Sequence, residues 1–428
     1  MSREWRIGVA GLGVVGGGLI RWLNERPDFA PGGDRIKLVG VTARDRDKPR
    51  GVDLSGIEWF DHPLSLAASP EVDVFVELIG GADGVARAAV TAALKIGKPV
   101  VTANKALIAA HGLELAALAE RTGAALHFEA AVMGGTPAVK LVREGLVGDD
   151  VVSIAGILNG TCNFILTEME RTERSFAVVL SEAQRLGYAE ADPSTDVGGF
   201  DAAHKIVILA ALAFGGAPNF AAAEVTGIDR VELIDIRLAR DLGYRIKLIA
   251  EASGGPGGAS VRVAPALVPL NHPLAQAGGA LNALFLEGQR VGRLYLQGAG
   301  AGAGPTAAAV AADIADVIAG ARRPVFGRPA ASLKPLATLE RGRQVDKAFL
   351  RLMVRDEPGT IAAVSEALAK AGVSIDSFLQ RPVEDSGHVP IVLITHPATE
   401  AAIDDAVTHI ASIPAVIERP RAIRVARI

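Results

Sequence analysis

Two kinds of segment alternate through the N-terminal part of the chain. Short segments rich in β-branched residues end at Gly, Pro or polar positions, and they read RIGVAG, IKLVGVTA, VDVFVELIG, KPVVTAN and AALHFEA. Between them lie Ala-rich segments with helical spacing, such as GVARAAVTAALKIG and LIAAHGLELAALAERTG. This alternation is typical of a parallel sheet covered by helices. Residues 1–135 are therefore predicted to form an α/β domain.

The pattern loosens from Thr136, and we interpret residues 136–321 as a second domain of the α+β type. Helix-like segments (136–146, 175–187) occur together with strand-like segments (151–158, 243–250, 261–268, 290–297). The Gly-rich segment SGGPGGAS, residues 253–260, is predicted to be a flexible loop. The Ala-rich residues 305–321 are predicted to form a helix, and periodicity leaves open whether it returns to the first domain.

The C-terminal part has its own regular order of elements. Residues 322–346 are rich in Pro and basic residues and are predicted to be a linker. Residues 347–428 then predict strand, helix, strand, strand, helix and strand, with turns at RDEPGT and EDSG. The order βαββαβ is the ferredoxin-like arrangement, which we expect for this third domain.

Composition narrows the classes of partner. The net charge is −4 and no segment forms the basic stripe that nucleic-acid binding requires. The apolar run from Ile206 to Phe214 is too short to span a membrane. Glu4 and the motif glycines argue against a signal peptide at the N-terminus. The single cysteine, Cys162, excludes an intramolecular disulfide and is typical of the cytoplasm, where we expect the protein.

A glycine motif follows the first predicted strand. It has the G-x-G-x-x-G spacing and comprises Gly11, Leu12, Gly13, Val14, Val15 and Gly16. Between a strand and a helix, this spacing is typical of the Rossmann fold, in which a dinucleotide pyrophosphate approaches the turn. A βα turn without a ligand is the alternative. Ile79 and Gly80, at the end of VDVFVELIG, are assigned to the same cofactor site.

The second strand indicates which nicotinamide cofactor is preferred. An acidic residue about 20 residues after the motif usually binds the ribose of NAD. Here the strand ends in Thr42-Ala43-Arg44, with Arg46 and Lys48 following. A cation suits the 2′-phosphate of NADP, so we predict NADP(H) over NAD(H) and assign Arg44 to that phosphate. Arg46 and Lys48 are equally compatible with solvated surface charge.

The segment EADPSTDVGGFDAAHK, residues 190–205, carries most of the candidate chemistry. Asp201 and Lys205 are four residues apart and therefore share one helix face. Ordinary surface pairs have this spacing too, but the helix that follows is apolar on every side and should be buried. A buried Lys205 can donate a proton during carbonyl reduction, with Asp201 to orient it. His204 points elsewhere on the helix and is interpreted as structural.

These residues resemble the signature of the homoserine dehydrogenase family. The matching pattern runs from Ala183 through GYAEADP (187–193) to DVGGFD (196–201) and Lys205. TANK, FEAAVMGGTP, NGTCNFILT and GAGAGAGPTA match further family segments in family order, so that the resemblance covers nearly the whole chain. It implies NAD(P)-dependent interconversion of L-aspartate 4-semialdehyde and L-homoserine in threonine and methionine biosynthesis. It also implies a substrate-binding, catalytic and dimerising role for the second domain.

The resemblance assigns roles to individual residues. Lys205 matches the proton donor, Lys105 a second lysine of the site and a cofactor contact, and Asp201 an acidic residue at the substrate. Further matches to the substrate site are Glu190, Asp196, Asn159 and Thr161, and to the cofactor site Gly187 and Gly302. The resemblance also implies a site for a monovalent cation, Na⁺, formed by Glu129, Val132, Gly134 and Thr136. Asp192 and Asp196 can each bind substrate or support Lys205.

The C-terminal domain resembles an ACT domain, through RDEPGTIAAVSEALAKAGVSI. This implies feedback inhibition by threonine, with a role in assembly alone as the alternative. We expect a homodimer or a homotetramer.

Two other functions are alternatives to this one. Cys162 stands where the family often has threonine, and it makes a phosphorylating semialdehyde dehydrogenase the alternative enzyme. A non-catalytic amino-acid sensor is the alternative outside enzymes.

Overall fold

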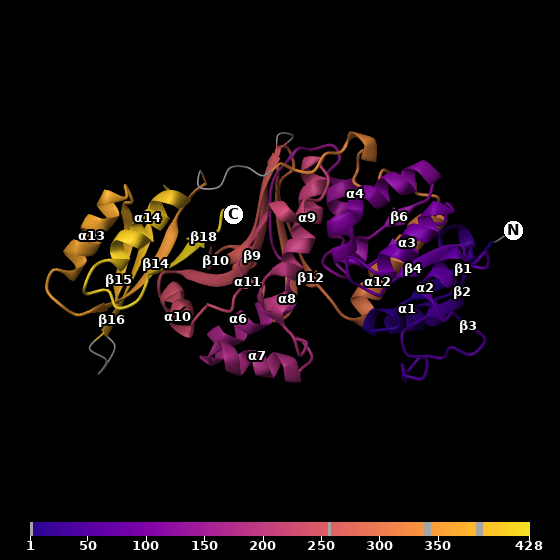
Figure 1. Cartoon of the computed structure of the whole chain (residues 1–428), viewed down its shortest axis with the longest axis horizontal. Coiled ribbons are helices and arrows are strands. Elements are labelled where there is room, and N and C mark those ends of the chain that lie inside the picture. Colours follow the sequence, from indigo (N-terminus) through magenta and orange to yellow (C-terminus); the bar gives the residue numbers. More distant parts are fainter. Residues whose placement is uncertain (1–2, 256–257, 338–343, 382–387) are drawn as a thin grey trace.

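The computed structural model describes residues 3–255, 258–337, 344–381 and 388–428. Three parts follow one another along the longest axis, with the N-terminal domain at one end and the C-terminal domain at the other (Figure 1). Part of the predicted linker (338–343), the EDSG turn and the tip of SGGPGGAS (256–257) lie outside the described residues. No helix of the described ranges is both long and apolar enough to cross a membrane.

The N-terminal domain is a parallel Rossmann sheet, as predicted. Its strand order is β3-β2-β1-β4-β5-β6. The strands are β1 (Glu4–Ala10), β2 (Arg35–Thr42), β3 (Glu58–Trp59), β4 (Val74–Glu77), β5 (Val100–Thr102) and β6 (Leu126–His127). The helices are α1 (Val14–Glu25), η1 (Pro31–Gly33), α2 (Pro63–Ala68), α3 (Val85–Lys95) and α4 (Lys105–Thr122). The order reverses between β1 and β4, where such folds bind dinucleotides.

The second domain is built on a mixed sheet with β12-β11-β7-β9-β10 as its order. Its strands are β7 (Val151–Ile157), β8 (Ala223–Val225), β9 (Tyr244–Gly255), β10 (Gly258–Pro269), β11 (Leu281–Gly288) and β12 (Gly292–Ala299). The prediction of a loop at 253–260 is wrong, because β9 and β10 pair as far as Gly255 and Gly258. Backbone pairing in a long antiparallel ribbon therefore outweighs the low strand propensity of these glycines.

Helices cover this sheet and connect it to the first domain. They are η2 (Glu129–Ala131), α5 (Ala138–Lys140), η3 (Leu141–Gly145), α6 (Gly160–Thr172), α7 (Phe176–Arg185), α8 (Ser194–Val197), α9 (Phe200–Phe214), η4 (Phe220–Ala222), α10 (Leu233–Asp241), α11 (Pro273–Gln276), α12 (Ala303–Ile318) and η5 (Ala330–Ser332). Helix α12 packs in the Rossmann core, where Ala307 and Val310 lie in one cluster with Leu19 and Ile20 of α1.

The C-terminal domain has the ferredoxin-like order that the sequence predicts. Its elements are β13 (Val345–Asp346), β14 (Ala348–Arg355), α13 (Thr360–Lys370), β15 (Ile375–Gln380), β16 (His388–Thr395), β17 (Ala398–Thr399), α14 (Glu400–Ala411) and β18 (Arg421–Val425). Strand β18 also pairs with β10 of the second domain, at Ala266 with Arg424 and at Leu267 with Val425. The two sheets are therefore one continuous sheet.

Ion pairs cross the same boundary. The side chain of Arg351 in β14 is 3% exposed, and its guanidinium lies 2.6 Å from Asp235 and 3.0 Å from Glu232 of the second domain. Glu418 of the C-terminal domain lies 2.8 Å from the same guanidinium. A buried charge is costly unless it is paired, so these contacts depend on the two domains keeping their relative position.

Lys247 of β9 is a buried lysine whose Nζ has no carboxylate within ion-pair distance among the residues described. Its Nζ donates to the Asn163 side-chain oxygen at 2.7 Å and to the Ala277 carbonyl at 2.8 Å. Burial lowers the pKa of Lys247 from 10.5 to about 7. Between these values the unfolded chain binds a proton that the folded protein does not, so this group makes the folded state more stable as the pH rises.

Lys247→Met should therefore show a pH-dependent difference in stability from the parent protein. The variant loses the hydrogen bonds of Nζ at every pH, but it also avoids the free-energy cost of the buried charge, which is greatest near pH 7. We expect Tm of the variant minus Tm of the parent to decrease steadily between pH 7 and 10 in thermal denaturation. The exposed Lys95→Met is the control. A constant difference for Lys247→Met would contradict the lowered pKa.

Candidate active site

Asp201 lies in the first turn of α9 and is buried together with most of that helix. Lys205, one turn later, donates from Nζ to Asp201 Oδ2 at 2.7 Å and to the carbonyl of Leu158 at 2.7 Å. The apolar residues of α9 pack in the core of the second domain, which brings both charged side chains out of solvent. The structure therefore joins the pair that the spacing predicts.

Lys105 approaches the same carboxylate from the other domain. It begins α4 directly after the N-cap Asn104, whose side chain accepts from the amide of Leu107. Its Nζ lies 3.0 Å from Asp201 Oδ1, and its side chain is 39% exposed. The carboxylate of Asp201 thus has one lysine on each oxygen, of which Lys205 is buried and Lys105 is partly exposed.

Asn159 connects Asp201 to a second carboxylate. Its Nδ2 donates to Asp201 Oδ2 at 2.9 Å and to Asp196 Oδ1 at 2.8 Å. Its side-chain oxygen accepts from the amide of Cys162 and caps α6. The side-chain amide of Asn159 therefore holds the two acidic side chains at a fixed separation, because its contact with α6 keeps it in place.

The charges in this cluster perturb one another. Burial opposes ionisation of Asp201, but the ammonium groups of Lys205 and Lys105 outweigh it, and the pKa of Asp201 lies well below its usual range. Burial lowers the pKa of Lys205, whereas the Asp201 carboxylate raises the pKa of Lys105. Burial also raises the pKa of Asp196. The two lysines therefore differ in acidity, and Lys205 releases its proton more readily.

The remaining predicted substrate residues surround this cluster. Thr161 donates to the carbonyl of Tyr188 at 2.6 Å and ties α6 to the loop that contains Gly187 and Glu190. Glu190 is exposed and close enough to Lys105 to raise its pKa. Asp192, by contrast, is exposed and accepts from the amide of Ser194 at 3.1 Å, a local turn contact.

His204 points away from the cluster of Asp201, as expected. Its ring stacks on Phe220 with 4.5 Å between ring centroids. This contact provides a packing role for His204 without any contact to the carboxylates.

Cys162 does not support the thiol mechanism. Its side chain is fully buried in the core, and its Sγ donates to the carbonyl of Asp196 at 3.1 Å. Burial raises the pKa of the thiol well above its usual value. A nucleophilic cysteine needs a lowered pKa and access to the substrate. The alternative of a phosphorylating semialdehyde dehydrogenase is therefore not supported.

The glycine motif forms a tight turn at the switch point of the Rossmann sheet. A Cβ on Gly11 would lie 2.4 Å from the carbonyl of Leu78, and one on Gly16 would lie 2.1 Å from the carbonyl of Gly11. Gly13 faces open space and is the N-cap of α1, which has no acidic residue in its first turn. Helix N-termini of this kind bind phosphate groups, so the turn fits the pyrophosphate of a dinucleotide.

A buried glutamate that was not among the predicted site residues holds the loop next to this turn. Glu77 ends β4, and its carboxylate accepts from the amides of Ile79 and Gly80 at 2.7 and 3.0 Å. It also accepts from Thr102 at 2.6 Å. Its signal in the sequence is a single charge at the end of an apolar strand. Arg44, two residues after β2, is exposed beside the turn that follows the strand.

The segment assigned to a monovalent cation lies between the domains. The carboxylate of Glu129 accepts from the amides of Val139 and Lys140 at 2.9 and 2.7 Å. Burial and the nearby carboxylate of Asp313 raise the pKa of Glu129 to about 7. The segment packs on residues 298–301, because a Cβ on Gly134 would lie 2.7 Å from the backbone of Gly300.

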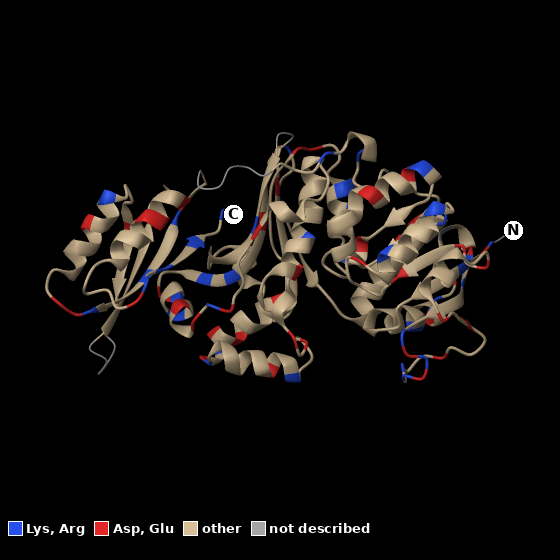
Figure 2. Ribbon diagram, in the orientation of Figure 1, with Lys and Arg blue, Asp and Glu red and all other residues tan. Residues whose placement is uncertain are grey.

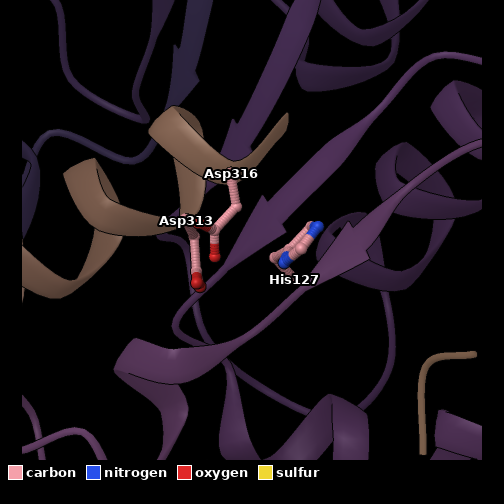
Figure 3. Close-up of side chains that lie close together, drawn as sticks. All are labelled: His127, Asp313 and Asp316. Atoms are coloured by element: carbon pink, nitrogen blue, oxygen red, sulfur yellow. The ribbon is translucent and has the colours of Figure 1, made fainter. Parts of the chain in front are cut away.

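A second polar cluster lies next to this segment. His127 of β6 and Asp313 and Asp316 of α12 point toward one another (Figure 3). Nζ of Lys140 lies 2.6 Å from Asp316 and 3.4 Å from Asp313. Burial lowers the pKa of His127 to about 4, so its ring is neutral. Lys140 supplies the positive charge of this cluster.

A Rossmann sheet with a dinucleotide turn, next to a buried lysine–carboxylate cluster, defines the class of NAD(P)-dependent oxidoreductases. Family models of the homoserine dehydrogenase NAD-binding domain, homoserine dehydrogenase and the ACT domain match residues 11–129, 137–315 and 348–415. The chain belongs to the homoserine dehydrogenase family, whose members oxidise or form a CH–OH group with NAD(P).

Named relatives and solved structures match between three quarters and almost all of the chain. The homoserine dehydrogenase of Neisseria gonorrhoeae is 41% identical over 97% of this chain and 96% of its own. A crystal structure of a homoserine dehydrogenase from Thiobacillus denitrificans has 38% identity and a TM-score of 0.91, and covers 99% of both chains. A structure of a mutant hyperthermophilic archaeal homoserine dehydrogenase in complex with NADPH has 28% identity and a TM-score of 0.64, and the match covers 75% of this chain and 99% of that one.

Cys162→Ala should leave turnover without phosphate within about twofold of the parent enzyme. The thiol only packs and donates one hydrogen bond to a carbonyl, so its loss affects stability by about 1 kcal/mol. Steady-state assays of nicotinamide turnover with L-aspartate 4-semialdehyde, without and with phosphate, are the measurement. Loss of turnover in a variant with parental Tm would restore the thiol mechanism.

Proposed function

We propose that this enzyme reduces L-aspartate 4-semialdehyde to L-homoserine with NADPH as the preferred cofactor, and that the reaction is reversible. The observation that carries the proposal is the Asp201 carboxylate between the ammonium groups of Lys205 and Lys105. Reduction of an aldehyde requires a proton at the oxygen while hydride adds to the carbon. Bound NADPH supplies the hydride.

Lys205 is assigned as the proton donor. Burial makes its ammonium group more acidic than an ordinary lysine, and two of its protons are held by Asp201 and the Leu158 carbonyl. The third proton is free for the substrate oxygen. Lys105 keeps its charge, because Asp201 raises its pKa, and stabilises negative charge that develops on the same oxygen.

The carboxylates around the lysines suit the other end of the substrate. Glu190 is exposed and Asp196 is held by Asn159, so both can bind the substrate ammonium group. Thr161 holds the loop of Glu190 against α6 and is assigned to positioning. Gly187 lies in that loop and Gly302 is the N-cap of α12, and both are assigned to the cofactor site.

A monovalent cation is assigned to the segment of Glu129, Val132, Gly134 and Thr136. The raised pKa values of Glu129, about 7, and of Asp313, about 6, support this assignment, because burial disfavours the negative charge of both carboxylates more than nearby Lys140 stabilises it. A cation on carbonyl and carboxylate oxygens of this segment would supply that charge and tie the two domains together.

The ACT domain is assigned to feedback regulation by an amino acid, with threonine as the first candidate. Support comes from its direct backbone pairing with β10 of the catalytic domain. Assembly as a homodimer or homotetramer is part of the same proposal.

The direct test is an NADPH oxidation assay with L-aspartate 4-semialdehyde, together with product identification. We expect L-homoserine as the product. Lys205→Ala should lower kcat by at least about 100-fold, the low end for loss of a general acid. His204→Gln, one residue away on the same helix, is the matched control and should stay within a few-fold of the parent.

Near-parental kcat for Lys205→Ala would exclude this lysine as the donor. If the parent enzyme does not oxidise NADPH with the semialdehyde, the proposed reaction is wrong.

Arg44→Asp should weaken NADPH about tenfold or more while changing NADH little. The substitution removes a charge-assisted hydrogen bond to the 2′-phosphate and adds a repulsive charge. KM for each cofactor is the measurement, with Arg46→Asp for comparison. An equal loss for both cofactors would mean that Arg44 does not bind the phosphate.

A further inference from the structure

Glu77 is a buried carboxylate that none of the proposed catalytic steps uses. It is fully buried at the end of β4, and no ammonium or guanidinium group of the described residues lies within ion-pair distance of it. Figure 2 shows the charged residues of this domain mainly in its helices and loops. A buried charge without a cation is costly, so the hydrogen bonds of Glu77 must outweigh that cost.

These hydrogen bonds join two strands and the loop beside the glycine turn. Glu77 and Thr102 are register partners at the carboxyl ends of β4 and β5, so their side chains lie on the same face of the sheet. One carboxylate oxygen accepts from the amides of Ile79 and Gly80, and the other accepts from the Thr102 hydroxyl. The loop lies against the glycine turn, because a Cβ on Gly11 would lie 2.8 Å from the amide nitrogen of Ile79.

Asn104 closes this set of hydrogen bonds into a ring. Its backbone amide donates to Thr102 Oγ1 at 2.9 Å, and its side-chain Nδ2 donates to the carbonyl of Gly81 at 2.8 Å. The ring thus runs from the loop through Glu77, Thr102 and Asn104 and back to the loop. All three side chains are buried, and a buried polar network with its partners in place is rigid.

The same asparagine begins the helix that carries Lys105. Asn104 is the N-cap of α4, and its side-chain oxygen accepts from the amide of Leu107 at 3.0 Å. Lys105 is the next residue, and its Nζ lies 3.0 Å from Asp201. Since the side chain of Lys105 is partly exposed, its position depends on this ion pair and on the first turn of α4. A movement of the ring therefore changes where the ammonium group of Lys105 lies.

We infer that Glu77 and Thr102 are positioning residues, which hold the loop 79–81 and the start of α4 as one rigid unit and so set the place of Lys105 relative to the bound nicotinamide cofactor. Both act through the loop and Lys105 rather than on the substrate itself. The geometry matters because a displacement of about 1 Å in an active site can lower a rate by about 100-fold. The inference rests on the proposed function, since that function gives Lys105 its role.

The test compares Thr102→Val with Thr102→Ser in the full-length enzyme. Valine has the shape of threonine without the hydroxyl, so it removes the bond to Glu77 and the acceptor for the Asn104 amide, whereas serine keeps both. We expect T102V to lower kcat with L-aspartate 4-semialdehyde and NADPH by about tenfold or more, and T102S to stay within about threefold of the parent. KM for NADPH should change less than kcat in T102V, because the Glu77 carboxylate still accepts from the loop amides.

A double-mutant cycle with Lys105→Ala separates positioning from a general loss of structure. If Thr102 acts through Lys105, T102V should lower the rate by less than about twofold in an enzyme that already lacks this ammonium group. Single turnovers with enzyme in excess keep the slow variants measurable. E77Q keeps the shape of Glu77 and one acceptor oxygen. It should show the same dependence on Lys105, and it decides the question if T102V does not fold.

Thr395→Val is the matched control. Thr395 is a fully buried threonine of the C-terminal domain, and its hydroxyl oxygen accepts from the amide of Ala348 at 3.0 Å. T395V therefore removes the same kind of hydrogen bond in another domain and should keep the parental kcat.

The inference is overturned if T102V keeps the parental kcat, if T102S or T395V loses as much as T102V, or if T102V lowers the rate equally with and without Lys105. A parent enzyme that does not turn over the semialdehyde contradicts the proposed function instead. The crystal structure of T102V then tests the inference by itself. A displaced Lys105 would support it, and Lys105 and residues 79–81 in their parental positions would overturn it.

Discussion

The placement of one carboxylate between two lysines from different domains is the constraint on which this active site depends. Asp201 is buried, so its charge is tolerable only because Lys205 and Lys105 lie within 3.0 Å of its two oxygens. Lys105 begins a helix of the Rossmann domain, and Lys205 lies on a helix of the second domain. The ion pair therefore fixes how the cofactor domain faces the substrate domain, and the same contacts set the acidity of the proton donor.

The remaining architecture keeps this cluster in place and connects it to the C-terminal domain. Helix α9 packs on β9 and β10, and β10 continues through β18 into the ACT sheet. Two arginines at this boundary form ion pairs across it, Arg351 with Asp235 and Arg262 with Glu400. A shift of the ACT domain would break backbone pairing and buried ion pairs together, so it must be transmitted to the catalytic domain.

Most of the fold and part of the site were predictable from local pattern. The Rossmann strands, the βαββαβ order and the pairing of Asp201 with Lys205 follow from short-range spacing, which the structure confirms. Strand β11 and helices α6 and α10 were not predicted, and 253–260 was predicted as a loop. These segments are specified by partners distant in the sequence. Strand β11 pairs with β7, and Asn163 of α6 donates to the carbonyls of Ala277 and Leu281.

By itself the sequence determined the strand and helix periods, the glycine turn and the helical register of Asp201 and Lys205, because each depends on residues only a few positions apart. Only the tertiary structure decided that Lys105 reaches Asp201, that Glu77 holds the loop of Ile79 and Gly80, that Cys162 is sealed in the core, and that α12 returns to the first domain. The physical reason is that burial and charge pairing depend on tertiary contacts. The residues that make these contacts are far apart in the sequence and are brought together by the sheets and domains.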